Sequence, residues 1–135
     1  MFPLSSRILI IDDMDTMRQI TMSHLRRGGY EHLSQAKNGE IGFSKIMERH
    51  WTTLSFDLVM ADWHMPVMSG LELLKKVRST IEIQDLPFIL FTSENEAKNV
   101  IEAVLAGVSC YIVKPITYEV LKEKLLVAWQ KHHQP

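Results

Sequence analysis

Cysteine is almost absent from this sequence of 135 residues, which contains Cys110 and no other cysteine. One cysteine cannot form an internal disulfide. Without a Cys-x-x-Cys pair or a Cys/His cluster, a cysteine-based structural zinc site is excluded as well. We therefore expect the chain to work in a reducing compartment, the cytoplasm.

An excess of positive charge and long apolar runs are also missing. Lysine and arginine number 15, aspartate and glutamate 16, and the net charge is -1. This balance provides no general basic field for binding nucleic acid or an anionic membrane. No apolar run approaches the roughly 18 to 20 residues of a membrane span, and residues 1–7 lack the pattern of a signal peptide. We expect no membrane insertion and no direct nucleic-acid binding, so function must reside in a local site.

The sequence does contain enough apolar material for one compact domain. Hydrophobic residues make up 46% and charged residues 23%, which are ordinary values for a globular protein. At about 100 to 200 residues per domain, the length predicts a single domain over residues 1–135. We place its core at about 7–131 and expect no separate output domain.

Short β-rich runs alternate with helical patterns along the chain. The runs are residues 8–11, a weaker candidate at 32–36, and residues 58–61, 88–91 and 111–113. After each run, apolar residues recur at helical spacing. The predicted helices cover about 15–27, a segment after 38–39, a segment that begins near 69, about 94–105, and a segment after 117. Continuous apolar runs are typical of strands covered on both faces. The pattern predicts an α/β fold, a (βα)5 doubly wound parallel five-stranded sheet.

Apolar spacing also indicates which side of each helix faces the sheet. In the first predicted helix the inward residues are Met17, Ile20 and Leu25. In the fourth they are Ala97, Val100, Ile101 and Val104, and in the fifth Leu121, Leu125 and Ala128.

Polar side chains follow four of the five predicted strands. They are Asp12 and Asp13, Asp62, Thr92 and Ser93, and Lys114. In open α/β sheets ligands bind beyond the carboxyl ends of the strands. We therefore expect these groups to form one site.

The turn after the first strand contains no glycine, which argues against a phosphate-cradling flavin or dinucleotide loop. Three carboxylates in one cleft repel each other unless a divalent metal neutralises them. All candidate ligands are oxygen donors, and Mg²⁺ fits such a partly open site best. Lys114 and Thr92 suit the oxygens of a phosphoryl group. The set predicts a phosphoryl-transfer site in which a carboxylate can be the nucleophile.

With these residues in place, the chain resembles the receiver domains of two-component response regulators, and most of all their stand-alone chemotaxis type. The resemblance covers nearly the whole chain, from Ile8 to about Lys131. The segments that carry it are Asp12-Asp13 with Thr16-Met17-Arg18, Asp62-Trp63-His64-Met65-Pro66 leading into Gly70-Leu71-Glu72-Leu73-Leu74-Lys75, and Tyr111 through Lys114-Pro115.

The resemblance implies a flavodoxin-like sheet with strand order 2-1-3-4-5 and a role for each matching residue. Asp62 would be the phosphoacceptor, and Asp12, Asp13, Asp62 and the backbone carbonyl of His64 would hold Mg²⁺. Lys114 would pair with the phosphoryl group, followed by Pro115 in a cis peptide bond. Thr92 and Tyr111 would form the switch pair.

Two positions depart from the family pattern where the hydrolytic water passes. His64 and Glu94 stand there and would modulate the lifetime of the phosphorylated state. The role of Asp15, a further acid in the first loop, is not assigned by the resemblance.

The resemblance also implies partners. A histidine kinase or histidine phosphotransfer protein would be the phosphodonor, and a downstream protein would bind through the fourth helix, fifth strand and fifth helix. A flagellar motor component is the first expectation for that protein.

Three alternatives stay open from the residues. The chain can be a receiver cut from a larger regulator, or a pseudo-receiver that acts as a scaffold without phosphorylation. It can also be a haloacid-dehalogenase-like phosphatase using Asp13 and Asp15, although Met17 stands where that family needs threonine or valine. In the receiver reading the chain is not an enzyme, beyond its own phosphorylation and dephosphorylation.

Overall fold

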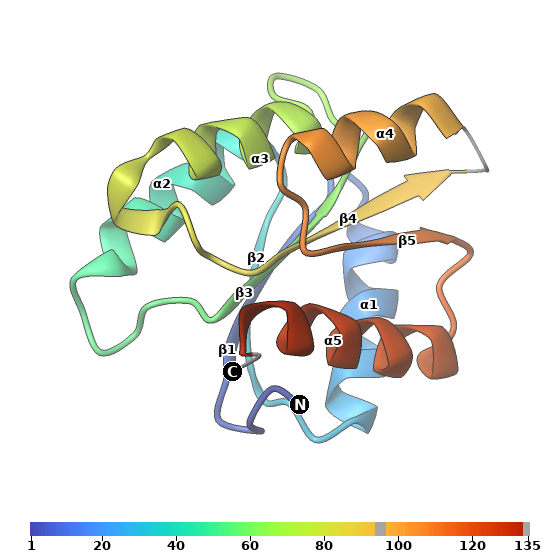
Figure 1. Cartoon of the computed structure of the whole chain (residues 1–135). Coiled ribbons are helices and arrows are strands. Elements are labelled where there is room, and N and C mark those ends of the chain that lie inside the picture. The colour runs from blue at the N-terminus through green and yellow to red at the C-terminus, as the bar shows by residue number, and fades with distance from the viewer. Residues whose placement is uncertain (94–96, 134–135) are drawn as a thin grey trace.

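A computed structural model describes residues 1–93 and 97–133. Five strands alternate with five helices (Figure 1). The strands are β1 (Arg7–Ile11), β2 (His32–Ala36), β3 (Leu58–Asp62), β4 (Phe88–Ser93) and β5 (Cys110–Lys114). The helices are α1 (Asp15–Arg27), α2 (Gly39–His50), α3 (Gly70–Ser79), α4 (Ala97–Leu105) and α5 (Tyr118–His132), with a 3-10 turn, η1 (Ile81–Ile83).

All strand pairs are parallel, and the sheet order is β2-β1-β3-β4-β5. The predicted (βα)5 doubly wound sheet with order 2-1-3-4-5 is therefore confirmed. The weak second run is a strand, and β3, β4 and β5 each extend past their apolar run to include Asp62, Thr92 and Lys114.

The two faces of the sheet are buried under different helices. Side chains alternate along a strand, so Ile8 and Ile10 of β1 pack with α1 and α5. Leu9 and Ile11 pack on the other side with residues of α2, α3 and α4. Figure 1 shows the same layers, with α2, α3 and α4 above the sheet and α1 and α5 below it. This double cover explains why the central strands contain continuous apolar runs, at residues 8–11, 58–61 and 88–91.

Several helix ends follow from local sequence. Ser69 caps α3 in a reciprocal capping box with Glu72, and the Thr117 side chain accepts from Val120 N at 3.2 Å at the start of α5. Such caps satisfy backbone N–H groups that a helix leaves free. They fix where α3 and α5 begin, at Gly70 and Tyr118, after the loops that follow Asp62 and Lys114.

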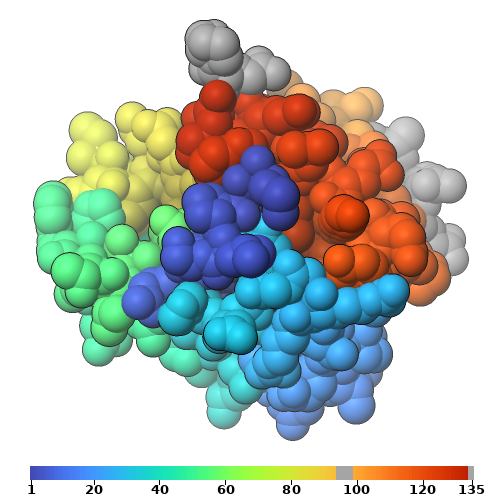
Figure 2. Space-filling view, turned by 90° about the horizontal axis from the view of Figure 1, so that it is seen from below, coloured from blue at the N-terminus to red at the C-terminus, as the bar shows by residue number. Residues whose placement is uncertain are grey.

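The N-terminal residues close the lower end of the molecule. Figure 2 shows them in dark blue between α5 and the end of α1. The Phe2 ring is buried and meets Trp129 edge-on at 5.3 Å, while the Tyr30 hydroxyl donates to Phe2 O at 2.8 Å. The N-terminal residues therefore pack against α5 and the segment after α1.

Two predicted helix faces are wrong in part. Ile20 of α1 is 44% exposed, and the buried residues of that helix are Arg18, Thr21, Met22 and Leu25. In α4, Ile101 and Val104 are 59% and 58% exposed, whereas Ala103 is fully buried. The small Ala103 side chain lets α4 approach the sheet with its less apolar side. The prediction for Leu121, Leu125 and Ala128 of α5 is confirmed.

Among the described residues, no helix is long and apolar enough to cross a membrane.

Candidate functional site

The predicted site residues meet at the carboxyl edge of the sheet. Asp12 and Asp13 directly follow β1, Asp62 is the last residue of β3, and Lys114 is the last of β5. Thr92 lies near the end of β4. Because all strands are parallel, these ends share one edge, next to the point where the chain reverses its direction of winding.

Three carboxylates form the centre of the site. One oxygen each from Asp12, Asp13 and Asp62 lies within 4.8 Å of the other two. Asp12 and Asp62 are buried, whereas Asp13 is exposed. The cluster is therefore held by the protein on one side and open to solvent on the other, which is the arrangement of an ion site that keeps some of its waters.

Burial raises the pKa of Asp12, and the neighbouring carboxylates of Asp62 and Asp13 raise it further. A hydrogen bond from Met14 N to Asp12 Oδ1, 2.9 Å long, and the charge of Lys114 act in the opposite direction. The protein thus brings negative charges together against their repulsion. Such a cluster fits a divalent cation, since its oxygens are hard ligands and its charge calls for neutralisation.

Lys114 supplies the positive charge already present in the site. Its Nζ lies 3.0 Å from Asp62 Oδ1, and the two side chains are 23% and 9% exposed. The Lys114–Pro115 peptide bond that follows is cis.

The position of Asp62 is fixed by the backbone around it. Trp63 N donates to Phe91 O at 2.9 Å, and Gly70 N donates to Trp63 O at 2.9 Å. A Cβ atom at Gly70 would lie 2.3 Å from Asp62 O and 2.7 Å from Leu90 Cδ2. Only glycine permits this approach, so α3 packs directly against the end of β3.

Thr92 carries a hydroxyl that is buried and has no hydrogen-bond partner within the described residues. A buried polar group without a partner is costly and calls for an explanation. Tyr111, on the adjacent strand β5, is only half-buried, and Lys124 Nζ lies 5.5 Å from its ring centroid. The Thr92 hydroxyl is therefore available for a new acceptor, and the Tyr111 ring is not locked in the core.

The two residues predicted to modulate hydrolysis are His64 and Glu94. The His64 side chain is exposed, and Glu94 lies outside the described residues.

Asp15 does not join the cluster. It ion-pairs with Arg18, and its side chain is 85% exposed. The three carboxylates that cluster are those of Asp12, Asp13 and Asp62, so the pairing of Asp13 with Asp15 that a haloacid-dehalogenase-like phosphatase would use is not favoured.

Sequence reasoning overlooked Arg18, whose guanidinium is buried behind the first loop. The signal was present, because Arg18 lies one turn before Met22 and two turns before Leu25 on the buried side of α1.

Comparison with known proteins agrees with this geometry. Residues 8–126 match the family model described as the response regulator receiver domain. The chain is 43% identical to the chemotaxis protein CheY1 of Helicobacter pylori, over 90% of this chain and 94% of that protein. It is 41% identical to the chemotaxis protein CheY-3 of Vibrio cholerae, over 88% of each chain.

Among solved structures, the chemotaxis response regulator CheY4 of Vibrio cholerae superposes with a TM-score of 0.81 at 28% identity, covering 92% of this chain and 98% of that one. The receiver of a histidine kinase from Syntrophus aciditrophicus, at 23% identity, has the same fold with a TM-score of 0.81. The chain belongs to the response regulator receiver family, as a CheY-like signalling protein rather than a classical enzyme.

Proposed function

We propose that this protein is a chemotaxis response regulator whose activity is controlled by phosphorylation of Asp62. The observation that carries the proposal is the carboxylate cluster of Asp12, Asp13 and Asp62 with Lys114 Nζ 3.0 Å from Asp62 Oδ1. A carboxylate, a site for a divalent cation and a fixed ammonium group are the parts that phosphoryl transfer to an aspartate needs. The relatives named as chemotaxis proteins support the biological role.

In this proposal Mg²⁺ is held by Asp12, Asp13 and Asp62, with the His64 backbone carbonyl as a further ligand. The metal would neutralise charge on the phosphoryl oxygens during transfer. Asp13 is the exposed member of the cluster, which leaves it accessible to an ion arriving with its waters.

The phosphodonor is the phosphohistidine of a histidine kinase or histidine phosphotransfer protein. An Asp62 oxygen attacks the phosphorus atom, a P–O bond forms and the P–N bond breaks. The histidine ring leaves and takes up a proton. Lys114 pairs with a phosphoryl oxygen, which stabilises the charge that Asp62 now carries. Attack of water on the same phosphorus atom later breaks its bond to the Asp62 oxygen, which releases inorganic phosphate and returns Asp62 to its carboxylate form. His64 and Glu94 would modulate this step.

The switch consists of Thr92 and Tyr111. Phosphorylation adds about -1.5 to -2 charges and strong acceptor oxygens. The Thr92 hydroxyl, without a partner among the described residues, then gains an acceptor by moving toward the phosphoryl group. Tyr111 turns inward as Thr92 moves. This couples the site to the neighbouring surface by shifting a two-state equilibrium.

That surface, on α4, β5 and α5, is where a downstream protein binds. Ile101, Val104 and Leu105 form an exposed apolar stripe on α4, with Leu105 82% exposed. The stripe is the side of α4 that the sheet does not cover. Contiguous exposed apolar side chains mark protein-binding sites. A component of the flagellar motor is the partner class that the chemotaxis relatives favour.

The decisive experiment is phosphorylation by acetyl phosphate with Mg²⁺, measured by intact mass. We expect one added phosphoryl group, removed by hydroxylamine and absent in Asp62→Asn. Asp85→Asn, an exposed aspartate between η1 and β4, is the matched control and should label like the wild type. Equal labelling of Asp62→Asn and wild type would contradict the assignment.

A further inference from the structure

Arg18 stands out because its charge is buried next to an acidic site that it does not enter. Its side chain is 10% exposed. A buried guanidinium is costly unless its donors are satisfied. In the proposed phosphorylation chemistry Arg18 has no task, so its retention inside the protein needs another reason.

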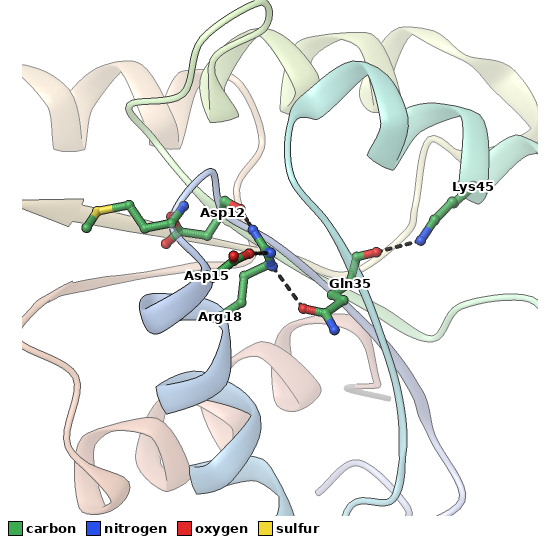
Figure 3. A network of polar contacts seen from close by, with 6 residues as sticks. Asp12, Asp15, Arg18, Gln35 and Lys45 are labelled. Atoms are coloured by element: carbon green, nitrogen blue, oxygen red, sulfur yellow. Dashed lines mark hydrogen bonds and ion pairs between the residues drawn. The ribbon is translucent and has the colours of Figure 1, made fainter.

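The donors of Arg18 reach three different segments (Figure 3). Nη1 donates to the backbone carbonyl of Asp12 at 2.6 Å, and Nε donates to Gln35 Oε1 at 2.9 Å. Nη2 pairs with the carboxylate of Asp15. One side chain of α1 therefore connects the loop after β1, the first turn of α1, and the neighbouring strand β2.

The contact with Asp12 is directed at the site. The Asp12 carbonyl belongs to the peptide unit that joins Asp12 to Asp13, so fixing this oxygen fixes the orientation of both residues. The Asp12 carboxylate is held separately by Met14 N at 2.9 Å, and Asp12 N donates to Ala36 O at 3.1 Å. Arg18 thus completes the restraint of a loop whose carboxylates repel each other.

Gln35, which accepts from Arg18 Nε, is itself held by a second contact. Lys45 Nζ of α2 donates to Gln35 O at 2.5 Å, as Figure 3 also shows. The chain of contacts therefore runs from α2 through β2 and Arg18 to the acidic loop. A side chain fixed at its far end can orient the loop, whereas one in solvent could not.

We propose that Arg18 is a positioning residue for the metal site, which holds the peptide between Asp12 and Asp13 so that both carboxylates face the ion. The inference rests on the proposed function in so far as that function supplies the ion. Asp15 has a defined part in it, since it offsets the positive charge that Arg18 brings near the site.

The direction in which Mg²⁺ affinity changes distinguishes a positioning role of Arg18 from a purely electrostatic one. Removing a positive charge near an acidic cluster by itself tightens the binding of a divalent cation. Removing a positioning contact weakens it. A weaker affinity in a variant without the Arg18 charge can therefore come only from lost positioning.

The test is a Mg²⁺ titration of the whole protein, followed by the fluorescence of Trp63, which adjoins Asp62 in the sequence. Trp51 and Trp129 are replaced by phenylalanine in every sample, so that Trp63 is the only reporter. In this background we expect Arg18→Met to raise the dissociation constant roughly fivefold, which corresponds to about 1 kcal/mol, the net contribution of a typical hydrogen bond. Arg18→Lys, which keeps the charge but not the fork of donors, should not restore affinity. Binding as tight as the parent, or tighter, in Arg18→Met would overturn the proposal.

Further variants separate misfolding and failure of the proposed function from failure of this inference. Gln35→Leu keeps Arg18 and removes only the acceptor of its Nε, and we expect the Mg²⁺ dissociation constant to rise roughly twofold. If Arg18→Met were unfolded and Gln35→Leu bound Mg²⁺ as tightly as the parent, the positioning role would be contradicted. The amide NMR shifts of Asp13 and Met14 without Mg²⁺ should move in Arg18→Met, which a purely global loss of stability does not produce. If the parent itself does not bind Mg²⁺, or Asp13→Asn binds it equally well, the proposed metal site fails rather than the role of Arg18.

Discussion

Lys114 Nζ lies 3.0 Å from Asp62 Oδ1, so the cation of the site pairs with the carboxylate proposed to receive the phosphoryl group. The two residues come from the ends of β5 and β3, with β4 between them. The Lys114 ammonium therefore competes with a metal ion for the negative charge of Asp62. In the proposed mechanism, Lys114 exchanges this carboxylate for a phosphoryl oxygen after transfer.

Removing the Lys114 charge should strengthen the binding of Mg²⁺ to the carboxylate cluster. In Lys114→Met we expect the Mg²⁺ dissociation constant to fall roughly 1.4- to fivefold, because a solvent-accessible ion pair contributes about 0.2–1 kcal/mol. Phosphorylation by acetyl phosphate should nevertheless slow, since the phosphoryl oxygens lose their ammonium partner. Lys122→Met, an exposed lysine of α5, is the control and should leave both measurements unchanged. Weaker Mg²⁺ binding in Lys114→Met would contradict the competition.

The raised pKa of Asp12 makes a prediction for stability against pH. Between its ordinary pKa and the raised one, the folded protein binds more protons than the unfolded chain. The free energy of unfolding therefore falls as pH rises through this interval. Asp12→Asn should stabilise the metal-free protein at pH 7 by about 1 kcal/mol, and this gain should disappear as the pH falls to about 4. Urea unfolding of wild type and Asp12→Asn at pH 7 and at about pH 4 measures this difference in the free energy of unfolding.

Magnesium supplies the control for that variant. Mg²⁺ should raise the free energy of unfolding of the wild type more than that of Asp12→Asn, because the variant has lost one charged ligand. If Asp12→Asn were less stable than wild type at pH 7 without metal, the repulsion inferred from the cluster would be wrong.

The sheet and the acidic site could be predicted from sequence because both follow from simple rules. Strands buried on two faces must be apolar, and the parallel order brings residues such as Asp12 and Lys114 to one edge whatever their spacing in the chain. No tertiary detail was needed for either step.

The missed features depend on tertiary contacts. Apolar spacing in α4 identified a stripe with Ile101 and Val104, but spacing alone does not say whether a sheet or a partner covers it. The sheet covers Ala103 instead. Arg18 was missed for a similar reason, because a buried arginine is explained by acceptors on β2 and the first loop that no local pattern reveals.

The Thr92 hydroxyl should matter little to the resting protein. Thr92→Val keeps the shape and removes a buried hydroxyl without a partner in the described part of the chain, so the free energy of unfolding should change by less than about 1 kcal/mol or rise. Beryllofluoride, a mimic of the phosphoryl group, should bind less tightly because one donor is lost. Thr92→Ser keeps the hydroxyl and should bind it nearly as the wild type does. A Thr92→Val variant with undiminished beryllofluoride affinity would remove Thr92 from the switch.

Val67 is the only non-glycine residue with a positive φ among the residues that the structure describes. Its φ is 73°, and Met68 N donates across it to Pro66 O at 2.8 Å, which closes a tight three-residue turn. Positive φ is unfavourable for a β-branched residue, because its Cβ is crowded against the backbone. The side chain is largely exposed, so little packing offsets that strain.

Replacing Val67 should therefore stabilise the fold. We expect Val67→Asn, whose short polar side chain can hydrogen-bond locally at positive φ, to raise the free energy of unfolding by about 1 kcal/mol, while Val67→Ala gains less because its methyl group makes no such hydrogen bond. Mg²⁺ affinity should not change, since Asp62 is positioned by the backbone contacts of Trp63 and Gly70 rather than by the turn. Urea unfolding and Trp63 fluorescence measure the two quantities. A stabilised Val67→Asn with altered Mg²⁺ affinity would instead show that the strained turn helps to shape the metal site.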